Sequence, residues 1–244
     1  MIKRVAGYVL LGLLAYAFFL IWTLPAERAV ALVRKQAPQL QLSGVTGTAW
    51  SGRAATLQYQ TQQLPRFKWQ LKPLALVMGR VEFAITFDGE GRTGAATVGR
   101  RFDGALVLNQ VQATLPMAEL GAALALNGQL EVKLDELTAK GGVIQSATGE
   151  LHWRQAAMTT PAQKLGEFSA RISTDATGIK ALIRDEGGPL QLEGNLRLTG
   201  NGSYQFNAKA TVRDPQQTML RQVLQSAGRQ EPDGRVALEY NGHL

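Results

Sequence analysis

Short runs in which apolar and polar residues alternate fill most of this 244-residue chain. Within residues 81–87 every odd-numbered residue is large and apolar, and those between are small or polar. Similar runs occupy residues 130–134, 196–198, 204–212 and 236–240. Side chains on a strand point alternately to its two faces, so each run predicts a strand with one dry and one wet face. The chain is therefore predicted to be mainly β: an extended, twisted antiparallel meander of about ten to twelve strands, with two or three short helices.

A five-residue pattern, Gly-x-[Leu/Val]-x-apolar, recurs along the same region. It begins at Gly79, Gly104, Gly128, Gly149, Gly194 and Gly234, with a weaker copy at Gly166. Asn127 and Asp233 precede two of these glycines, and Asn-Gly and Asp-Gly are dipeptides that favour turns with positive φ. Each copy is thus predicted to mark the exit from a hairpin turn, with positive φ at Gly128 and Gly234.

Two helices and a last strand are predicted in the rest of this region. Residues 116–126 are apolar enough for two or three helical turns. The stretch from Asp214 to Gln217 looks like an N-cap, an N1 proline and a capping-box glutamine, so a helix is expected from Asp214 to about Ala227. Residues 235–241 alternate and predict a strand near the chain end, with the helix covering the neighbouring dry face.

The N-terminus contains an uncharged apolar segment, residues 5–24. Twenty helical residues reach about 30 Å, the thickness of the hydrocarbon core of a bilayer. Lys3 and Arg4 precede the segment, which by the positive-inside rule places residues 1–4 in the cytoplasm and the rest outside it. Tyr8 and Trp22 stand where interfacial anchors are expected. The segment is predicted to be a single-pass signal anchor, and a cleavable signal peptide with residues 29–31 as its cleavage site is the alternative.

Residues 25–37 follow the anchor and predict a short amphipathic helix. Pro25 suits a first helical turn, and the apolar residues fall on one face. This helix either lies at the outer membrane–water boundary or packs on the domain that follows. Residues 38–244 form that β-rich domain.

Composition argues against most kinds of catalytic or binding site. The chain has no cysteine and only two histidines, His152 and His243, and its carboxylates are scattered on the polar faces of predicted strands. The Gly-x-Gly-x-x-Gly at residues 89–94 precedes no predicted helix, so it is interpreted as a hairpin tip and not as a dinucleotide site. No catalytic residue, cofactor, metal or nucleic-acid partner is predicted, and the net charge of +7 suits contact with acidic partners or anionic lipid.

One local cluster of glycines and tryptophans is more specific. It comprises Gly44, Gly47, Trp50, Gly52, Trp69, Pro73 and Gly79. Glycines beside a tryptophan allow the backbone to approach a large ring closely. With the N-terminal anchor, this segment resembles the type II secretion system protein N family, and these residues are interpreted as structural.

The resemblance implies a bitopic component of the bacterial inner membrane with most of its chain in the periplasm. Such a protein would be a scaffold or assembly subunit of the machinery that exports folded proteins across the outer membrane, and not an enzyme. Its expected partners are other secretion subunits of the inner membrane and periplasm.

A second hypothesis comes from the predicted sheet itself. A long meander with one continuous dry face must cover that face with helices, with a second layer or with lipid. The alternative function is therefore a membrane-anchored periplasmic lipid carrier or lipid-bridging protein, similar in texture to the AsmA type.

Overall fold

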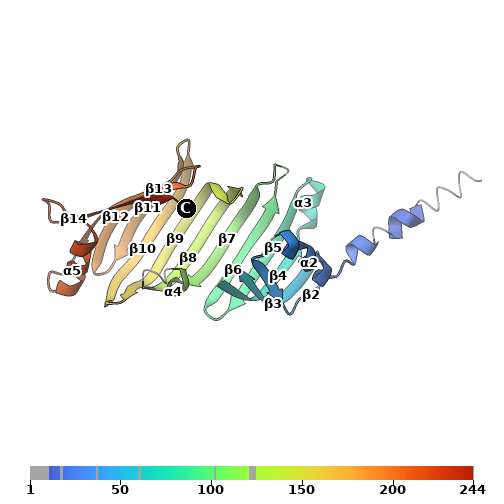
Figure 1. Ribbon diagram of the computed structural model, residues 1–244, viewed down its shortest axis with the longest axis horizontal. Coiled ribbons are helices and arrows are strands. Elements are labelled where there is room, and N and C mark those ends of the chain that lie inside the picture. Colours follow the sequence, from blue (N-terminus) through green and yellow to red (C-terminus); the bar gives the residue numbers. More distant parts are fainter. Residues whose placement is uncertain are drawn as a thin grey trace, which may run out of the picture.

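The protein folds into one long antiparallel sheet of fifteen strands with a few short helices (Figure 1). The computed structural model describes residues 11–16, 19–36, 38–59, 62–101, 103–120 and 125–243. The predicted mainly β fold is confirmed. The strand number exceeds the predicted ten to twelve partly because β1, β2 and β14 have only two to four residues, too few to show a period of two.

The helices are α2 (Ala26–Gln36), α3 (Pro73–Val77), α4 (Met117–Leu120) and α5 (Thr218–Ala227). The strands are β1 (Leu40–Ser43), β2 (Thr46–Gly47), β3 (Ser51–Tyr59), β4 (Gln62–Leu71), β5 (Val81–Gly89), β6 (Arg92–Arg100), β7 (Leu106–Pro116), β8 (Leu126–Lys140), β9 (Val143–Thr159), β10 (Ala162–Asp175), β11 (Gly178–Gly187), β12 (Leu190–Leu198), β13 (Ser203–Val212), β14 (Arg229–Gln230) and β15 (Val236–His243).

Neighbouring strands in the sheet are almost everywhere neighbours in sequence. From β3 to β13 each strand pairs with the next, β1 and β2 pair with β3, and β15 pairs with both β13 and β14. The Gly-rich segment at residues 89–94 is the tip between β5 and β6, as its interpretation as a hairpin predicts.

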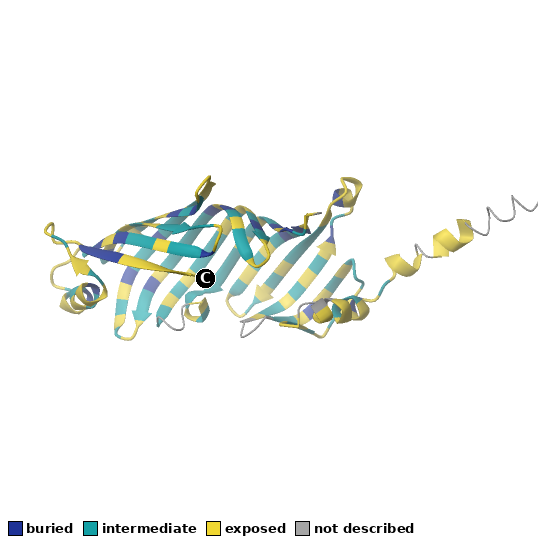
Figure 2. Cartoon of the chain, turned by 45° about the horizontal axis from the view of Figure 1, so that its top comes forward, coloured by how far each residue is buried: buried dark blue, intermediate teal, exposed yellow. Residues whose placement is uncertain are grey.

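The register brings apolar residues into continuous rows across the sheet. One row runs from Phe87 on β5 to Leu238 on β15 and contains only apolar residues and glycine. Its members are Phe87, Gly94, Ala113, Val132, Leu151, Ala170, Ile183, Gly194, Ala208 and Leu238. A single sheet thus carries one continuous apolar face, and Figure 2 shows how buried, half-buried and exposed residues alternate along its strands.

The recurring glycines divide into two groups. Gly79, Gly104 and Gly234 lie in turns, as predicted, and all three have positive φ, which was predicted only for Gly234 among them. The others, Gly128, Gly149, Gly166 and Gly194, lie inside strands, so the prediction that they mark turn exits is wrong, although the positive φ of Gly128 is confirmed.

The glycines inside strands have a different physical role. The pairing register shifts on both sides of Gly166, and it shifts between Asn127 and Gln129, which flank Gly128. Such bulges bend a strand and increase its twist, and a glycine there lets the next strand approach closely. These positions therefore help to curve the sheet.

The helix predictions are partly right. α5 ends where the predicted helix ends but begins four residues later, at Thr218, so Asp214 does not cap it, and Gln217 stands at the N-cap without a side-chain bond. Instead the carboxylate of Asp214 accepts the backbone N–H of Gln216 in a turn before the helix. Of the first predicted helix the structure describes α4 (Met117–Leu120), residues 121–124 lie outside the described residues, and Leu126 already belongs to β8.

The main hydrophobic core lies at the C-terminal end of the sheet. Leu220 and Leu224 of α5 pack against buried residues of β12, β13 and β15, including Leu190, Ala210 and Val236. The terminal strand β15 pairs with β13 along its whole length, so the predicted strand and the predicted covering helix are both confirmed.

Gly149→Ala is expected to destabilise the fold. A Cβ there would lie 2.6 Å from the Cα of Leu134, and the φ of +149° already disfavours a side chain. We expect the free energy of unfolding to fall by about 1–3 kcal/mol, which lowers Tm by about 2–4 °C per kcal/mol. The control is Gly200→Ala, because nothing lies within 4 Å of its Cβ position. Equal Tm values for the two variants would contradict the close approach at Gly149.

Candidate functional site

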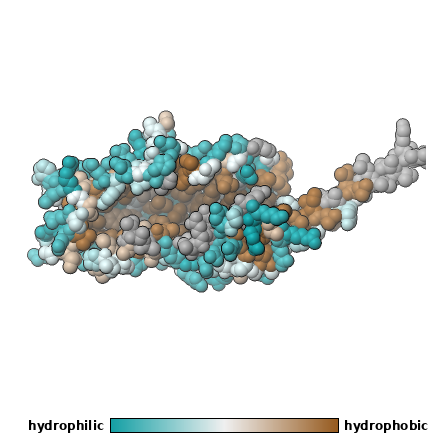
Figure 3. All heavy atoms as spheres, in the orientation of Figure 1, coloured by the Kyte–Doolittle hydropathy of each residue, from teal (hydrophilic) through white to brown (hydrophobic). Residues whose placement is uncertain are grey.

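The apolar face of the sheet lines a long hollow. Figure 3 shows hydrophobic atoms along the floor of this hollow, between hydrophilic rims. In its middle part the side chains of Val132, Leu151 and Ile172 are only half-buried. The sequence pattern predicted this apolar groove, since alternation along the strands requires one dry face.

The groove is covered at its C-terminal end. There α5 lies on the apolar face, and Leu220 and Leu238 are 2% and 9% exposed. Trp153 and Phe168 contact each other at the border of this core, with tilted rings whose centroids lie 5.7 Å apart. The covered end shows that an amphipathic helix fits the apolar face.

The tryptophan-glycine cluster joins the N-terminal segment to the opposite end of the sheet. The indole N–H of Trp50 donates to the carbonyl of Ile21 at 2.8 Å, and the backbone N–H of Ala49 donates to the carbonyl of Leu24, also at 2.8 Å. The indole N–H of Trp69 donates to the carbonyl of Ala49 at 3.2 Å. The two rings thus hold the loop before β3 between the helical segment at residues 19–22 and the sheet.

Gly44, Gly47 and Gly52 of this cluster stand where a side chain would not fit. Gly44 and Gly47 have positive φ, and a Cβ on Gly47 would lie 2.6 Å from the carbonyl oxygen of Ser51. Gly52 faces the ring of Trp69, and a Cβ there would lie 2.8 Å from Cε2. These contacts support the interpretation of the cluster as structural, which stays a prediction until substitutions test it.

Pro73 and Gly79 bracket α3. Pro73 takes the first helical position, where its missing N–H costs nothing. Gly79, with a φ of +71°, follows the helix, and the N–H of Arg80 donates to the carbonyl of Ala75 at 2.9 Å. This left-handed C-terminal cap turns the chain into β5.

The predicted anchor is described only in part. Lys3, Arg4 and Tyr8 lie outside the described residues. Residues 11–16 and 19–22 are helical, and Trp22, at the end of the second segment, is 51% exposed. Within the described part of the chain, no helix combines the length and the apolar character needed to cross a membrane.

The helix predicted at residues 25–37 is present as α2, and its place beside a membrane stays a prediction. Ala26 is buried against the sheet end, whereas Leu32 is 59% exposed. Arg34 and Lys35 stand in its last turn, where cations interact favourably with the helix dipole. The helix therefore packs on the domain with its first turn and leaves apolar surface open further on.

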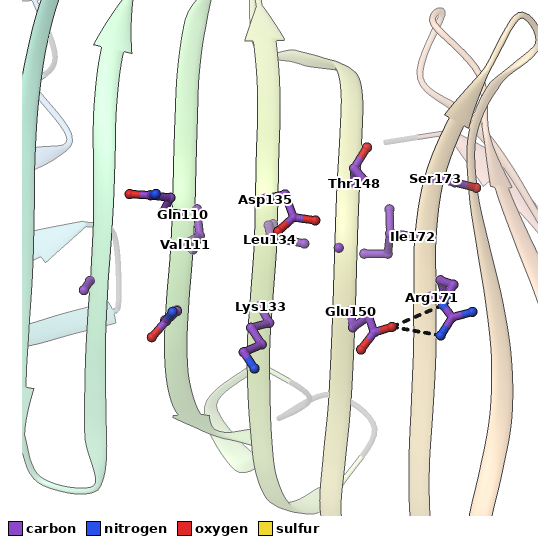
Figure 4. A pocket seen from close by; sticks show the side chains of 13 residues that line it. Gln110, Val111, Lys133, Leu134, Asp135, Thr148, Glu150, Arg171, Ile172 and Ser173 are labelled. Atoms are coloured by element: carbon purple, nitrogen blue, oxygen red, sulfur yellow. Dashed lines mark hydrogen bonds and ion pairs between the residues drawn. The ribbon is translucent and has the colours of Figure 1, made fainter. Parts of the chain in front are cut away.

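The polar face of the sheet has its own shallow depression. It measures about 840 Å³ and lies where β7 to β10 are irregular, around Gly149. Figure 4 shows Lys133, Glu150 and Arg171 side by side on three neighbouring strands. Arg171 donates to Glu150 through Nε and Nη2 at 3.1 and 3.0 Å. The depression is open, and the ion pair between Arg171 and Glu150 lies in it, which is typical of a solvated sheet surface.

Sequence reasoning missed one charged cluster on this face. Arg154 contacts Glu167 at 2.7 Å, Glu186 at 3.5 Å and Glu131 at 3.7 Å, and its hydrogen bond to Glu167 raises the pKa of Arg154 above its ordinary value. His152 Nδ1 lies 3.3 Å from Glu186. These carboxylates looked isolated in the sequence because only strand pairing brings them together. Among the described residues, no group of three or more His, Asp or Glu side chains is placed to hold a metal ion.

Comparison with known proteins decides the family. The family model described as "Type II secretion system (T2SS), protein N" matches residues 38–239. The chain belongs to this family. The matched range contains every residue of the tryptophan-glycine cluster and almost the whole sheet.

Relatives named Type II secretion system protein N match nearly the full chain. The protein from Aeromonas hydrophila is 29% identical over 96% of this chain and 96% of its own length. The protein from Vibrio cholerae is 28% identical over 99% and 100%, and that from Klebsiella pneumoniae is 26% identical over 95% and 94%. No solved structure matches the chain.

Gly52→Ala is expected to destabilise the protein by displacing Trp69. Overpacking of this kind costs about 1–3 kcal/mol, and the tryptophan fluorescence should change because the ring leaves its place over β3. The control is Ser51→Ala on the neighbouring position, whose side chain is exposed. If Gly52→Ala melts and fluoresces like the control, Gly52 has no role in seating the ring.

Proposed function

We propose that this protein is a single-pass inner-membrane component of a type II secretion machinery, with its sheet acting as a periplasmic scaffold or assembly subunit. The observation that carries the proposal is the family match over residues 38–239, together with relatives matched over nearly their full length. Its partners would be other secretion subunits of the inner membrane and periplasm.

The proposed membrane topology is supported by the N-terminal segment. Residues 5–24 carry no charge and follow Lys3 and Arg4, so residues 1–4 would be cytoplasmic and residues 25–244 periplasmic. In the described parts of this segment Leu13, Phe19 and Ile21 are 59–65% exposed, as suits side chains that face lipid.

The scaffold role is supported by the way the segment meets the sheet. The hydrogen bonds from Trp50 and Ala49 to Ile21 and Leu24 fix the direction in which the sheet leaves the segment. With these hydrogen bonds in place, the long apolar groove and the charged opposite face would lie at a fixed distance from the membrane. Such surfaces suit contacts with several subunits.

The lipid-carrier alternative has the apolar groove in its favour. The family and its named relatives, however, favour the secretion role over this alternative. Lipid analysis of the protein purified from membranes separates the two, because a carrier would retain bound phospholipid in stoichiometric amount.

The topology is tested with a reporter enzyme that is active only in the periplasm. Fused after residue 244, the reporter should be active, and fused at residue 4 it should be inactive, because the segment between the two sites would cross the membrane once. Mass spectrometry of the mature protein should find the N-terminal residues intact. A chain that begins at Glu27 or Leu32 would show that the segment is cleaved.

The secretion role is tested by deletion of the gene in its host. Proteins that the type II machinery exports should then accumulate in the periplasm, and the intact gene should restore their release. A matched variant, with residues 5–20 replaced by an unrelated single-span segment, keeps the bonded carbonyls at residues 21–24 and should also restore release. Normal secretion in the deletion strain would refute the proposed role.

A further inference from the structure

The helix α3 exposes an unusual amount of apolar surface. Leu74 is 77% exposed, Val77 85% and Met78 69%, while Ala75 is buried against the sheet. Leu76 adds a side chain that is 43% exposed. Neighbouring exposed apolar side chains in one short segment mark an interaction site more often than chance. The segment is therefore a candidate interaction site.

The position of α3 restricts what this occupant can be. Figures 1 and 2 show α3 at the same end of the sheet as α2 and the helical segments at residues 11–16 and 19–22. Hydrophobic atoms are visible at that end in Figure 3. A bilayer that held the N-terminal segment would therefore lie closer to α3 than to any part of the C-terminal half of the sheet.

The charge of the chain is concentrated at the same end. Residues 25–80, which contain α2, β1 to β4 and α3, hold eight Lys and Arg but one acidic residue, whereas residues 81–244 hold 16 basic and 18 acidic residues. Arg80 and Arg100 line one small pocket beside the end of α3, and the side chain of Arg80 is 58% exposed although it contacts Glu82 at 3.4 Å. This end therefore complements an anionic surface.

We infer that α3 is a second membrane-contact site, which inserts Leu74, Val77 and Met78 into the interface of a bilayer that contains anionic phospholipid. Exposed apolar side chains with basic residues beside them are the combination that binds such interfaces. The inference rests on the proposed N-terminal anchor, because the anchor brings the bilayer to this end. Two separate contacts would stop the sheet from rotating about a single tether and so fix the direction in which its groove faces.

The test uses site-specific labels, which the absence of cysteine makes straightforward. The variant is Val77→Cys in the full chain, and the matched control is Ala176→Cys. Each is labelled with an environment-sensitive fluorophore and reconstituted in phosphatidylcholine–phosphatidylglycerol vesicles. Ala176 is exposed in the turn between β10 and β11, and because alternate strand ends share an edge of an antiparallel sheet, it lies on the same edge as α3. Nitroxide-bearing lipid should quench the label at position 77 severalfold more than the label at position 176.

A charge variant and a flotation control complete the experiment. Replacing Arg80 and Arg100 by Gln in the Val77→Cys chain should reduce the lipid quenching in vesicles with phosphatidylglycerol, down to the level seen in pure phosphatidylcholine. The chain should float with vesicles after alkaline washing. If it floats but the label at position 77 is quenched by a water-soluble quencher and not by nitroxide-bearing lipid, α3 does not touch the bilayer and the inference is wrong. If the chain does not float, the proposed anchor itself fails.

Discussion

The structure depends on the need to shield one apolar face of a single-layer sheet. The register carries apolar residues without interruption from Phe87 on β5 to Leu238 on β15, so no polar column divides the face into smaller parts. A β-sandwich would cover such a face with a second sheet. Here curvature and the helix α5 shield it in part, and the remaining length forms an open groove.

Curvature is provided where the strands are irregular. At Gly149 and Gly166 the backbone of one strand comes so near to the next that a side chain would not fit, and the pairing shifts beside both positions. Ideal alternation alone would give a flatter surface and a more exposed apolar face. The shift beside Gly149 also lies at the shallow depression that Lys133 and Glu150 line on the opposite face.

The two ends of the sheet have different roles. The C-terminal end holds the main core and closes the groove, whereas the N-terminal end carries the positive charge, the exposed side chains of α3 and the loop that Trp50 and Trp69 hold. The main core and the proposed membrane attachment thus lie at opposite ends of the molecule. This separation leaves the middle of the sheet, with its half-buried apolar side chains and its paired charges, available to other subunits of the proposed machinery.

The sequence by itself determined the strands, their dry faces, the last strand with its covering helix, and the family, because these depend on local periodicity and on a compact motif. The roles of Gly149 and Gly166, the cluster around Arg154 and the bond from Trp50 to Ile21 were decided only by the tertiary structure. The physical reason is that each of these depends on which strand or segment lies alongside. A glycine in a turn and a glycine in a bulge look alike in sequence, and carboxylates on separate strands meet only through the register.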